Sequence, residues 1–381
     1  MDHEELLAKI TTFQPDMLDT LETLVRHESP STDKSALDSF ASIVSERFGS
    51  LGGEITILTN PSNGAQVQVL FQAPQAGSDR PGLILCHYDT VWPVGTIGER
   101  PFRISVNKAY GPGIYDMKAS LVMFEFALRA IADLGAHLPR PIVFLMTSDE
   151  EIGSPTSREL IERNARQADY VLVLEPPTVE GALKTARKGV GNFSLKVKGI
   201  AAHAGSQPER GVSAINELAH QILNLQGLAD DEKGTTVNVG IVEGGSRSNV
   251  IAAQAAAEID VRAWTPQEAE RIERTIINLQ PVNPGVELQI KGGFERPPMA
   301  RTEAIVKLFH KAQQIGKQLG LDLEEGSTGG GSDGNFTAAL GVPTLDGLGA
   351  MGDGAHADYE HILISHLPLR TALLAALLLE L

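Results

Sequence analysis

The pattern of apolar positions in the first part of the chain alternates between two periods. Residues 4–27 and 34–50 repeat apolar side chains with helical spacing, and Ser29-Pro30-Ser31 interrupts the pattern between them. Short apolar runs rich in Val, Ile and Leu follow, and a helical stretch at 117–134 lies between two of them. Continuous apolar strands separated by helices are typical of a buried, mostly parallel sheet. The predicted strands cover 66–71, 82–86, 141–147 and 170–174.

The middle of the chain follows a different pattern. Residues 191–198 alternate in strand fashion, and 211–229 have the spacing of an amphipathic helix. Thr265-Pro266-Gln267-Glu268 is a capping box with proline at the first helical position, so a second helix begins there. With three further strands, the order β-α-β-β-α-β is that of a ferredoxin-like unit. These strands are expected at 235–242, 254–264 and 285–291.

The α/β pattern resumes after Arg296-Pro297-Pro298, so the larger domain is discontinuous. A helix is expected at 301–320, followed by a glycine-rich loop at 326–334, a short strand near 342–348 and a final helix. The predicted fold class is α/β, with a mostly parallel central sheet flanked by helices and an inserted ferredoxin-like α+β domain. The predicted boundaries are 1–188 and 297–381 for the catalytic domain, and 189–296 for a lid and dimerisation domain.

Composition narrows the classes of function. The 381 residues carry a net charge of −16, which opposes binding to nucleic acids or anionic membranes. The single cysteine, Cys86, excludes a disulfide within the chain and a cysteine-based zinc site. The chain starts Met-Asp-His-Glu-Glu, unlike a basic signal peptide, and apolar stretches such as 372–379 are too short to span a membrane. We therefore expect a cytoplasmic protein.

Polar side chains follow the predicted strands at the points where they end. His87 and Asp89 come directly after one apolar run, and Glu150 and Glu151 come after another. Ligands bind at the carboxyl ends of strands in open α/β sheets. Taken singly, each of these residues is better explained as a surface turn or the start of a solvated helix. The same holds for three others, which are Asp116 after a Gly-Pro-Gly turn, Glu175 after a strand and His356 in a glycine-rich segment.

Taken together, these residues supply two histidines, three carboxylates and one spare carboxylate. Oxygen and nitrogen ligands in that mixture suit zinc, cobalt or manganese. The sequence also resembles the dinuclear zinc amidohydrolases, a group that includes glutamate carboxypeptidase (carboxypeptidase G), acetylornithine deacetylase, succinyl-diaminopimelate desuccinylase and aminoacylase. The resemblance runs from about residue 20 to the C-terminus, and glutamate carboxypeptidase is the nearest member. It rests on His87-Tyr88-Asp89-Thr90-Val91, Gly111-Pro112-Gly113-Ile114-Tyr115-Asp116-Met117-Lys118, Asp149-Glu150-Glu151-Ile152-Gly153-Ser154 and Gly329-Gly330-Gly331-Ser332-Asp333.

Two positions depart from the family pattern. Met117 stands where glutamate carboxypeptidase has a second aspartate, and Ala119 stands where many relatives have glycine. The resemblance otherwise implies two Zn²⁺ ions per chain, which Co²⁺ or Mn²⁺ could replace, with Glu150 as the general base. Asp89 would orient the imidazole of His87. The implied ligand set is Asp116 as a bridge, His87 and Glu175 at one metal, and Glu151 and His356 at the other.

The resemblance also implies roles in the inserted domain. His203 matches a histidine that reaches the active site of a partner subunit, which implies a homodimer formed through this domain. Asn249 and Arg262 match residues that help to hold substrate. Arg296 matches an arginine that grips the terminal carboxylate of the substrate, because a guanidinium can bind a carboxylate through two parallel hydrogen bonds. Outside the resemblance, His203 would be an ordinary loop histidine, and the arginines would be ion-pair residues.

The expected function is therefore hydrolysis of an amide bond adjacent to a free carboxylate in a small peptide, most plainly the release of a C-terminal glutamate. One alternative is an N-acyl-amino-acid deacylase that resembles acetylornithine deacetylase, with N-acyl amino acids as substrates. A dipeptidase of the same group is disfavoured, because those enzymes resemble this chain with Asp in place of Glu175. An alternative of another class is a catalytically inactive metal-binding scaffold, which would lack Glu150 or a ligand, and none is missing.

Overall fold

The computed structural model describes residues 2–73 and 80–381, and these form two compact units. The first unit contains the residues up to Thr185 together with Arg301–Thr328 and Ser332–Leu381. The second unit contains Ala186–Ala300 and Gly329–Gly331. Its borders lie three to four residues outside the predicted ones, because the backbone of Arg187 pairs with that of Met299. The guanidinium of Arg187 also donates to the carbonyls of Gly330 and Gly331, which explains why these glycines belong to the second unit.

The first unit is built on a six-stranded sheet with the order β1-β2-β6-β3-β7-β14. Strands β6, β3, β7 and β14 are parallel, and β2 runs antiparallel to both β1 and β6. The predicted, mainly parallel sheet is therefore confirmed, with an antiparallel edge. The strands are β1 (Glu54–Leu58), β2 (Gln66–Phe71), β3 (Gly82–His87), β6 (Ile142–Thr147), β7 (Tyr170–Val173) and β14 (Thr344–Leu345).

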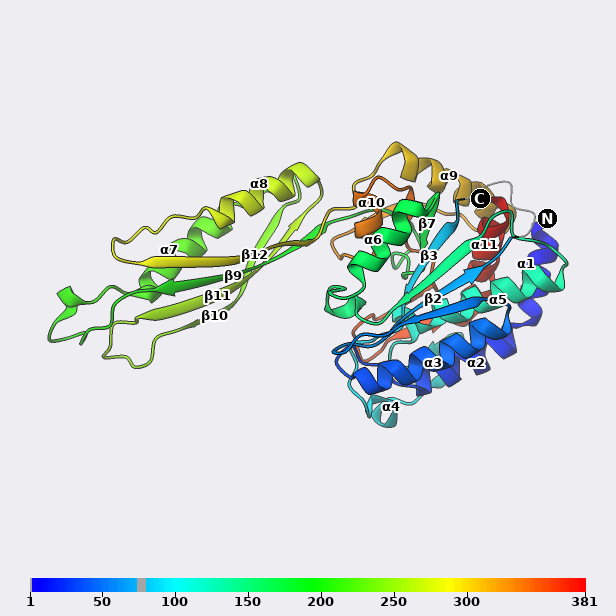
Figure 1. The fold of residues 1–381 in the computed structure, drawn as a ribbon, viewed down its shortest axis with the longest axis horizontal. Helices are drawn as coiled ribbons and strands as arrows, with labels where there is room; N and C mark the ends of the chain where they lie inside the picture. The colour runs from blue at the N-terminus through cyan, green and yellow to red at the C-terminus, as the bar shows by residue number, and fades with distance from the viewer. Residues whose placement is uncertain (1, 74–79) are drawn as a thin grey trace. The chain divides into compact units, whose positions relative to one another are not determined.

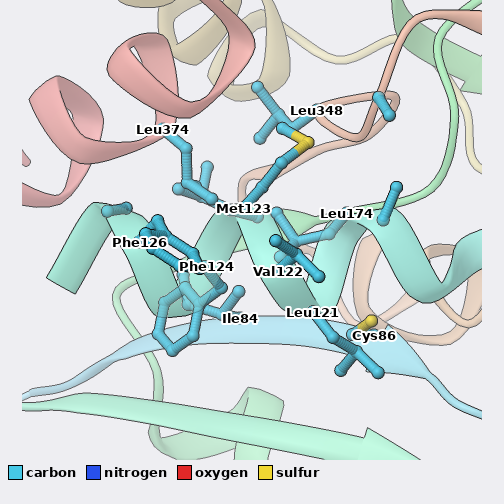
Figure 2. Close-up of a cluster of buried hydrophobic side chains, with 14 of the residues drawn as sticks. Ile84, Cys86, Leu121, Val122, Met123, Phe124, Phe126, Leu174, Leu348 and Leu374 are labelled. Atoms are coloured by element: carbon cyan, nitrogen blue, oxygen red, sulfur yellow. The ribbon is translucent and has the colours of Figure 1, made fainter. Parts of the chain in front are cut away.

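The central strands are apolar throughout because both faces of the sheet are covered. On one face, Ile84 and Cys86 of β3 pack against α5 (Ala119–Asp133), where Figure 2 shows Leu121, Val122 and Phe124. Leu374 of α11 (Leu367–Glu380) belongs to the same core. On the other face, alternate residues of β3 and β6 pack with α6 (Arg158–Gln167) and α10 (Gly334–Ala339), which lie together in Figure 1. The strands contribute Leu83, Leu85, Val143 and Leu145, and the two helices contribute Leu160, Ile161 and Phe336.

The helix expected at 4–27 is two helices, α1 (His3–Thr12) and α2 (Gln14–Arg26), which meet at Phe13. Pro15 stands in the first turn of α2. Proline has no N–H to continue a preceding helix but fits the first turn of a new one, which is why the chain breaks there. The other helices of the first unit are α3 (Lys34–Ser50), α4 (Thr96–Glu99) and α9 (Glu303–Gln318).

Two small sheets in the first unit were not predicted. One has the order β15-β16-β5-β4 and the other pairs β13 with β8. In the first of these, His361 of β16 lies opposite Tyr110 of β5, which joins two segments that are far apart in the sequence. Their strands are β4 (Arg103–Ser105), β5 (Lys108–Tyr110), β8 (Leu183–Arg187), β13 (Glu325–Thr328), β15 (Gly352–Asp353) and β16 (His361–Leu363).

The second unit follows the predicted element order, β9-α7-β10-β11-α8-β12. Its antiparallel sheet has the order β10-β11-β9-β12, and apolar residues of β9 and β11 pack with the two helices. Thr265 caps α8 by accepting from the N–H of Glu268, but the Glu268 carboxylate accepts from Arg271 and Thr235 instead of returning to Thr265. The elements are β9 (Gly189–Lys198), α7 (Ala214–Gln226), β10 (Thr236–Gly244), β11 (Gln254–Ala263), α8 (Pro266–Ile277) and β12 (Glu287–Arg296).

Within residues 2–73 and 80–381, no helix has both the length and the apolar character needed to cross a lipid bilayer.

Candidate metal centre

The carboxyl ends of three neighbouring strands deliver polar side chains to one edge of the central sheet. In the parallel pair of β3 and β6, His87 lies opposite Thr147, so the segments that follow both strands begin side by side. Strand β7 flanks β3 on its other side and leads to Glu175. Ligand atoms of His87, Glu150 and Glu175 lie within 4.8 Å of one another, as do those of His87, Asp116 and Glu151. This edge therefore has the donor set of a metal site.

Asp116 lies between two histidines that are far apart in the sequence. Its Oδ1 is 3.1 Å from Nε2 of His87, and its Oδ2 is 3.4 Å from Nε2 of His356. The same nitrogen of His356 is 3.0 Å from Oε2 of Glu151, and Nε2 of His87 is 3.6 Å from Oε1 of Glu175. Each oxygen of Asp116 thus faces a different histidine and a different second carboxylate. Asp116 could therefore be shared by two cations, with His87 and Glu175 available to hold one and His356 and Glu151 available to hold the other.

Asp89 contacts more than the imidazole that it was predicted to orient. Nδ1 of His87 is 3.0 Å from the backbone carbonyl of Asp89, closer than the 3.5 Å to its carboxylate, so the carbonyl is the main partner of this ring nitrogen. The carboxylate accepts N–H bonds from Glu150 at 3.2 Å and Glu151 at 3.1 Å, and a hydroxyl bond from Ser31 at 2.7 Å. Asp89 therefore holds the backbone of both glutamates as well as the ring of His87.

Glu150 belongs to the cluster formed by His87 and Glu175. The family resemblance implied that Glu150 is the general base and that Glu151 is a metal ligand. The geometry places the Glu150 carboxylate among the ligand atoms of one metal position, where it can contact either an ion or a water beside it.

The charges of the cluster perturb its titration. Burial alone would lower the pKa of His87, but hydrogen bonds to Asp116 and Asp89 hold that pKa well above its usual value. Hydrogen bonds to Asp116 and Glu151 raise the pKa of His356 to about 10. Burial would raise the pKa of Asp116, yet hydrogen bonds from both histidines keep it far below normal. The carboxylates therefore favour positive charge between them, which divalent cations supply as well as imidazolium groups do.

A second carboxylate, that of Asp333, supports the segment that carries Glu150 and Glu151. Sequence reasoning assigned no role to Asp333, although it belongs to one of the motifs that carry the resemblance. Asp333 ends the Gly329–Asp333 motif, and its Oδ2 accepts from the hydroxyl of Thr147 at 3.0 Å. Its Oδ1 accepts from the hydroxyl of Ser154. Because Thr147 precedes the two glutamates and Ser154 follows them, Asp333 ties together both ends of their loop.

The four residues predicted to act from the inserted domain all lie in the second unit. Nδ1 of His203 accepts N–H bonds from Gly205 and Ser206, both at 3.1 Å, so the neutral ring carries its proton on Nε2. Asn249 is exposed, and its backbone carbonyl accepts from Ala204.

The two arginines of that set have different surroundings. Nε and Nη2 of Arg262 donate to the carboxylate of Asp260 at 2.9 and 2.7 Å, which is the ion pair expected outside the resemblance. Arg296 is buried at the end of β12 and lies against Gly331, where an added Cβ would meet its Cδ at 2.8 Å. Only Arg296 has the burial expected of a residue that reads a substrate group.

Comparisons with known proteins show which family the chain is similar to. The model of peptidase family M20/M25/M40 matches residues 83–380. Carboxypeptidase G2 from Pseudomonas sp. (strain RS-16) is 32% identical over 99% of this chain and 92% of its own length. Succinyl-diaminopimelate desuccinylase from Delftia acidovorans is 28% identical over 76% of this chain and 78% of its own. The crystal structure of aminopeptidase PepT from Bacillus cereus shares the fold, with a TM-score of 0.77 at 22% identity over 96% of this chain and 98% of its own.

The family match spans residues 83–380, which is well over half of the chain, and carboxypeptidase G2 is 32% identical along nearly the whole chain. The chain belongs to peptidase family M20/M25/M40 and is a metal-dependent hydrolase of that family.

Proposed function

We propose that this protein is a two-metal hydrolase that cleaves an amide bond adjacent to a free carboxylate and releases a C-terminal glutamate. The observation that carries the proposal is the position of Asp116, whose two oxygens face His87 and His356 separately. The similarity to a carboxypeptidase along nearly the whole chain supports the reaction class.

Zn²⁺ is the ion proposed, with Co²⁺ or Mn²⁺ as substitutes, since the donors are imidazole nitrogens and carboxylate oxygens. When bound, two such ions supply an acidified water and positive charge for the oxyanion that develops at the scissile carbonyl. Glu150 accepts the proton of the attacking water and returns it to the leaving amine. Asp89 and Asp333 keep Glu150 in place through the backbone and through the two ends of its loop.

Arg296 is the proposed reader of the substrate carboxylate. A buried guanidinium presents two parallel N–H groups to a carboxylate, which gives geometric selectivity as well as attraction. The proposal predicts that Arg296→Ala harms acid substrates far more than the same substrates as C-terminal amides. Equal loss on both would identify Arg296 as a structural residue. The ion pair of Arg271 with Glu268 offers the matched control, because Arg271→Ala also removes a guanidinium from the second unit and Arg271 is not a proposed substrate-binding residue.

A hydrolysis screen with added zinc tests the main proposal. Peptides ending in glutamate, the same peptides ending in glutamine or as amides, and small N-acyl amino acids such as N-acetylornithine are compared by kcat/KM. The peptidyl-glutamates are expected to be the best substrates. If no peptidyl-glutamate is cleaved while a small N-acyl amino acid is turned over, the carboxypeptidase assignment is wrong.

That second outcome corresponds to an N-acyl-amino-acid deacylase. The similarity to a succinyl-diaminopimelate desuccinylase over three quarters of the chain favours it as the second candidate. Both activities break the same type of bond with the same centre, so the screen separates them by the acyl group that is accepted.

We also propose a homodimer formed through the second unit. Strand β10 lies at one edge of its sheet and, among the residues that the structure describes, pairs with β11 alone, and Ile241 and Val242 on it are 57% and 54% exposed. Leu223 of α7, which packs beside β10, is 67% exposed. An open strand edge with exposed apolar side chains favours pairing across a two-fold axis. The family resemblance adds that His203 would then serve the metal centre of the partner.

Complementation tests the shared site. His203→Ala and Glu150→Ala chains are each expected to be nearly inactive. After dissociation and reassociation of equal amounts, about half of the molecules are heterodimers by random pairing, and one site in each has an intact Glu150 and an intact partner His203. Activity should return to about a quarter of wild type. Verified heterodimers without activity would show that His203 does not act across subunits.

A further inference from the structure

Glu360 is a buried carboxylate that lies beside the proposed metal centre. It lies four residues after His356, and its exposed fraction is 2%. Its carboxylate accepts four hydrogen bonds, all from N–H groups. They come from the backbone of Gly113 at 2.8 Å, Tyr115 at 2.9 Å and Asp116 at 3.1 Å, and from Nε1 of Trp92 at 2.9 Å.

Three of the four donors belong to the segment that presents Asp116. The backbone of Asp116 is not helical, with φ −117° and ψ 91°, so no run of helical hydrogen bonds fixes its direction. Buried N–H groups must find acceptors, and here the acceptor is one carboxylate from a distant part of the chain. The pairing of β16 with β5, which places His361 opposite Tyr110, brings Glu360 to this segment.

We infer that Glu360 is a positioning residue that holds the bridging carboxylate of Asp116 in register with His356. The inference rests on the proposed two-metal centre. His356 and Glu360 lie in the same short segment between β15 and β16. The hydrogen bonds that the Glu360 carboxylate accepts from the Asp116 segment therefore fix the distance between the proposed ligands Asp116 and His356. Removing these hydrogen bonds to Glu360 is therefore expected to weaken metal binding as well as the stability of the fold.

Glu360→Gln tests this inference with little change in shape. Glutamine keeps one oxygen and replaces the other with NH₂, so in either orientation two of the four N–H donors lose their acceptor. The variant is expected to bind Zn²⁺ about 10- to 100-fold more weakly than wild type, the usual range for residues that support ligands. Zinc affinity and stoichiometry are measured by competition with a chromophoric chelator, and folding is measured by thermal unfolding of the metal-free protein.

Glu217 provides a matched control in the second unit. It is buried, and it also accepts four N–H bonds, from the backbone of Val282 and Asn283 and from the side chains of Asn283 and Gln221. Glu217→Gln removes the same chemistry, and the hydrogen-bond donors to Glu217 named above all belong to the second unit and are not residues of the proposed centre. It is expected to lower the melting temperature comparably and to leave zinc affinity within about two-fold of wild type, since supporting residues act on the ligands that they contact.

Trp92 supplies the second variant. Trp92→Phe removes one donor to Glu360 but keeps an aromatic ring for Arg100, which stacks at 3.7 Å from the ring centroid. In Glu360→Gln, the orientation that keeps oxygen on Tyr115 and Asp116 turns NH₂ toward Gly113 and Trp92. Adding Trp92→Phe to Glu360→Gln should therefore restore part of the zinc affinity that Glu360→Gln loses. If Glu360→Gln alone fails to fold, zinc affinity is measured on this double variant instead.

The outcomes separate this inference from the proposed function. If the wild-type chain binds no zinc, the two-metal proposal fails and the inference fails with it. If wild type binds two ions and Glu360→Gln binds them equally well, only the role of Glu360 is overturned. An equal loss of zinc affinity in Glu217→Gln would also overturn it, because the effect would then follow from general destabilisation.

Discussion

The backbone N–H of Glu151 donates to Oδ2 of Asp89 at 3.1 Å. The N–H of Glu150 donates to the other oxygen of the same carboxylate at 3.2 Å. The segment after β3 therefore holds the segment after β6 at the point where a proposed ligand and the proposed base stand next to each other. Because one carboxylate holds the backbone of both residues, the adjacent side chains of Glu150 and Glu151 can keep different positions and take different roles.

Glu150→Gln should retain its metal ions and lose most of its turnover. The amide has nearly the same shape as the carboxylate but cannot accept the proton of water, and loss of a general base typically costs about 10²- to 10⁴-fold in rate. Steady-state kcat and metal content are measured on the same preparation. Glu159→Gln, at an exposed position of α6, is the control. A near-normal kcat in Glu150→Gln would remove Glu150 from the role of base.

Removal of metal should abolish activity, and the gently purified protein should contain about two divalent ions per chain, as expected for a two-metal centre. Asp116→Asn should reduce the content of both ions, because each oxygen of Asp116 faces one of the two histidines. Elemental analysis before and after dialysis against a chelator, followed by addition of Zn²⁺, provides the measurement. Full activity in a metal-free protein would contradict the mechanism.

Ser154 should be more sensitive to alanine than to glycine. Its φ of +59° lies in the left-handed region, and its buried hydroxyl donates to Asp333. Ser154→Ala keeps the backbone strain and leaves Asp333 short of a donor, which costs about 1–3 kcal/mol. Ser154→Gly loses the same bond but relieves about 1 kcal/mol of strain. Urea unfolding should rank the variants as wild type, Gly, Ala, and the reverse order of Gly and Ala would exclude strain at this position.

Glu217 should make the stability of the second unit depend on pH. Burial alone would raise its pKa, but hydrogen bonds from Gln221, Val282 and Asn283 outweigh burial and lower the pKa below its ordinary value of 4.5. A carboxyl with a lowered folded-state pKa stabilises the fold above its unfolded-state pKa and loses this effect as pH falls through the folded-state value. The deficit of Glu217→Gln in urea unfolding should therefore be largest near neutral pH and should shrink in acid. A deficit that is independent of pH would show that the charge of Glu217 is unimportant.

The sequence by itself predicted the elements whose residues are buried on two sides or along one regular face. The run at 66–71 is β2, and the alternation around 191–198 belongs to β9. It also named the candidate metal ligands that the fold brings together, because strand ends and a recognisable set of motifs carry them. It did not predict β1, which is an exposed edge strand, or β15 and β16, whose two or three residues are too few to show a period.

Tertiary structure alone decided how the motifs meet. Glu151 and His356 are 205 positions apart, yet Nε2 of His356 lies 3.0 Å from Oε2 of Glu151, and no spacing in the sequence implies that distance. The same holds for Glu360, three of whose four partners are backbone N–H groups 244 to 247 positions away. Side-chain type and local period are written in the sequence, so they predict elements and candidate ligands. Backbone N–H groups are the same at nearly every residue, so only the fold selects which of them a buried carboxylate holds.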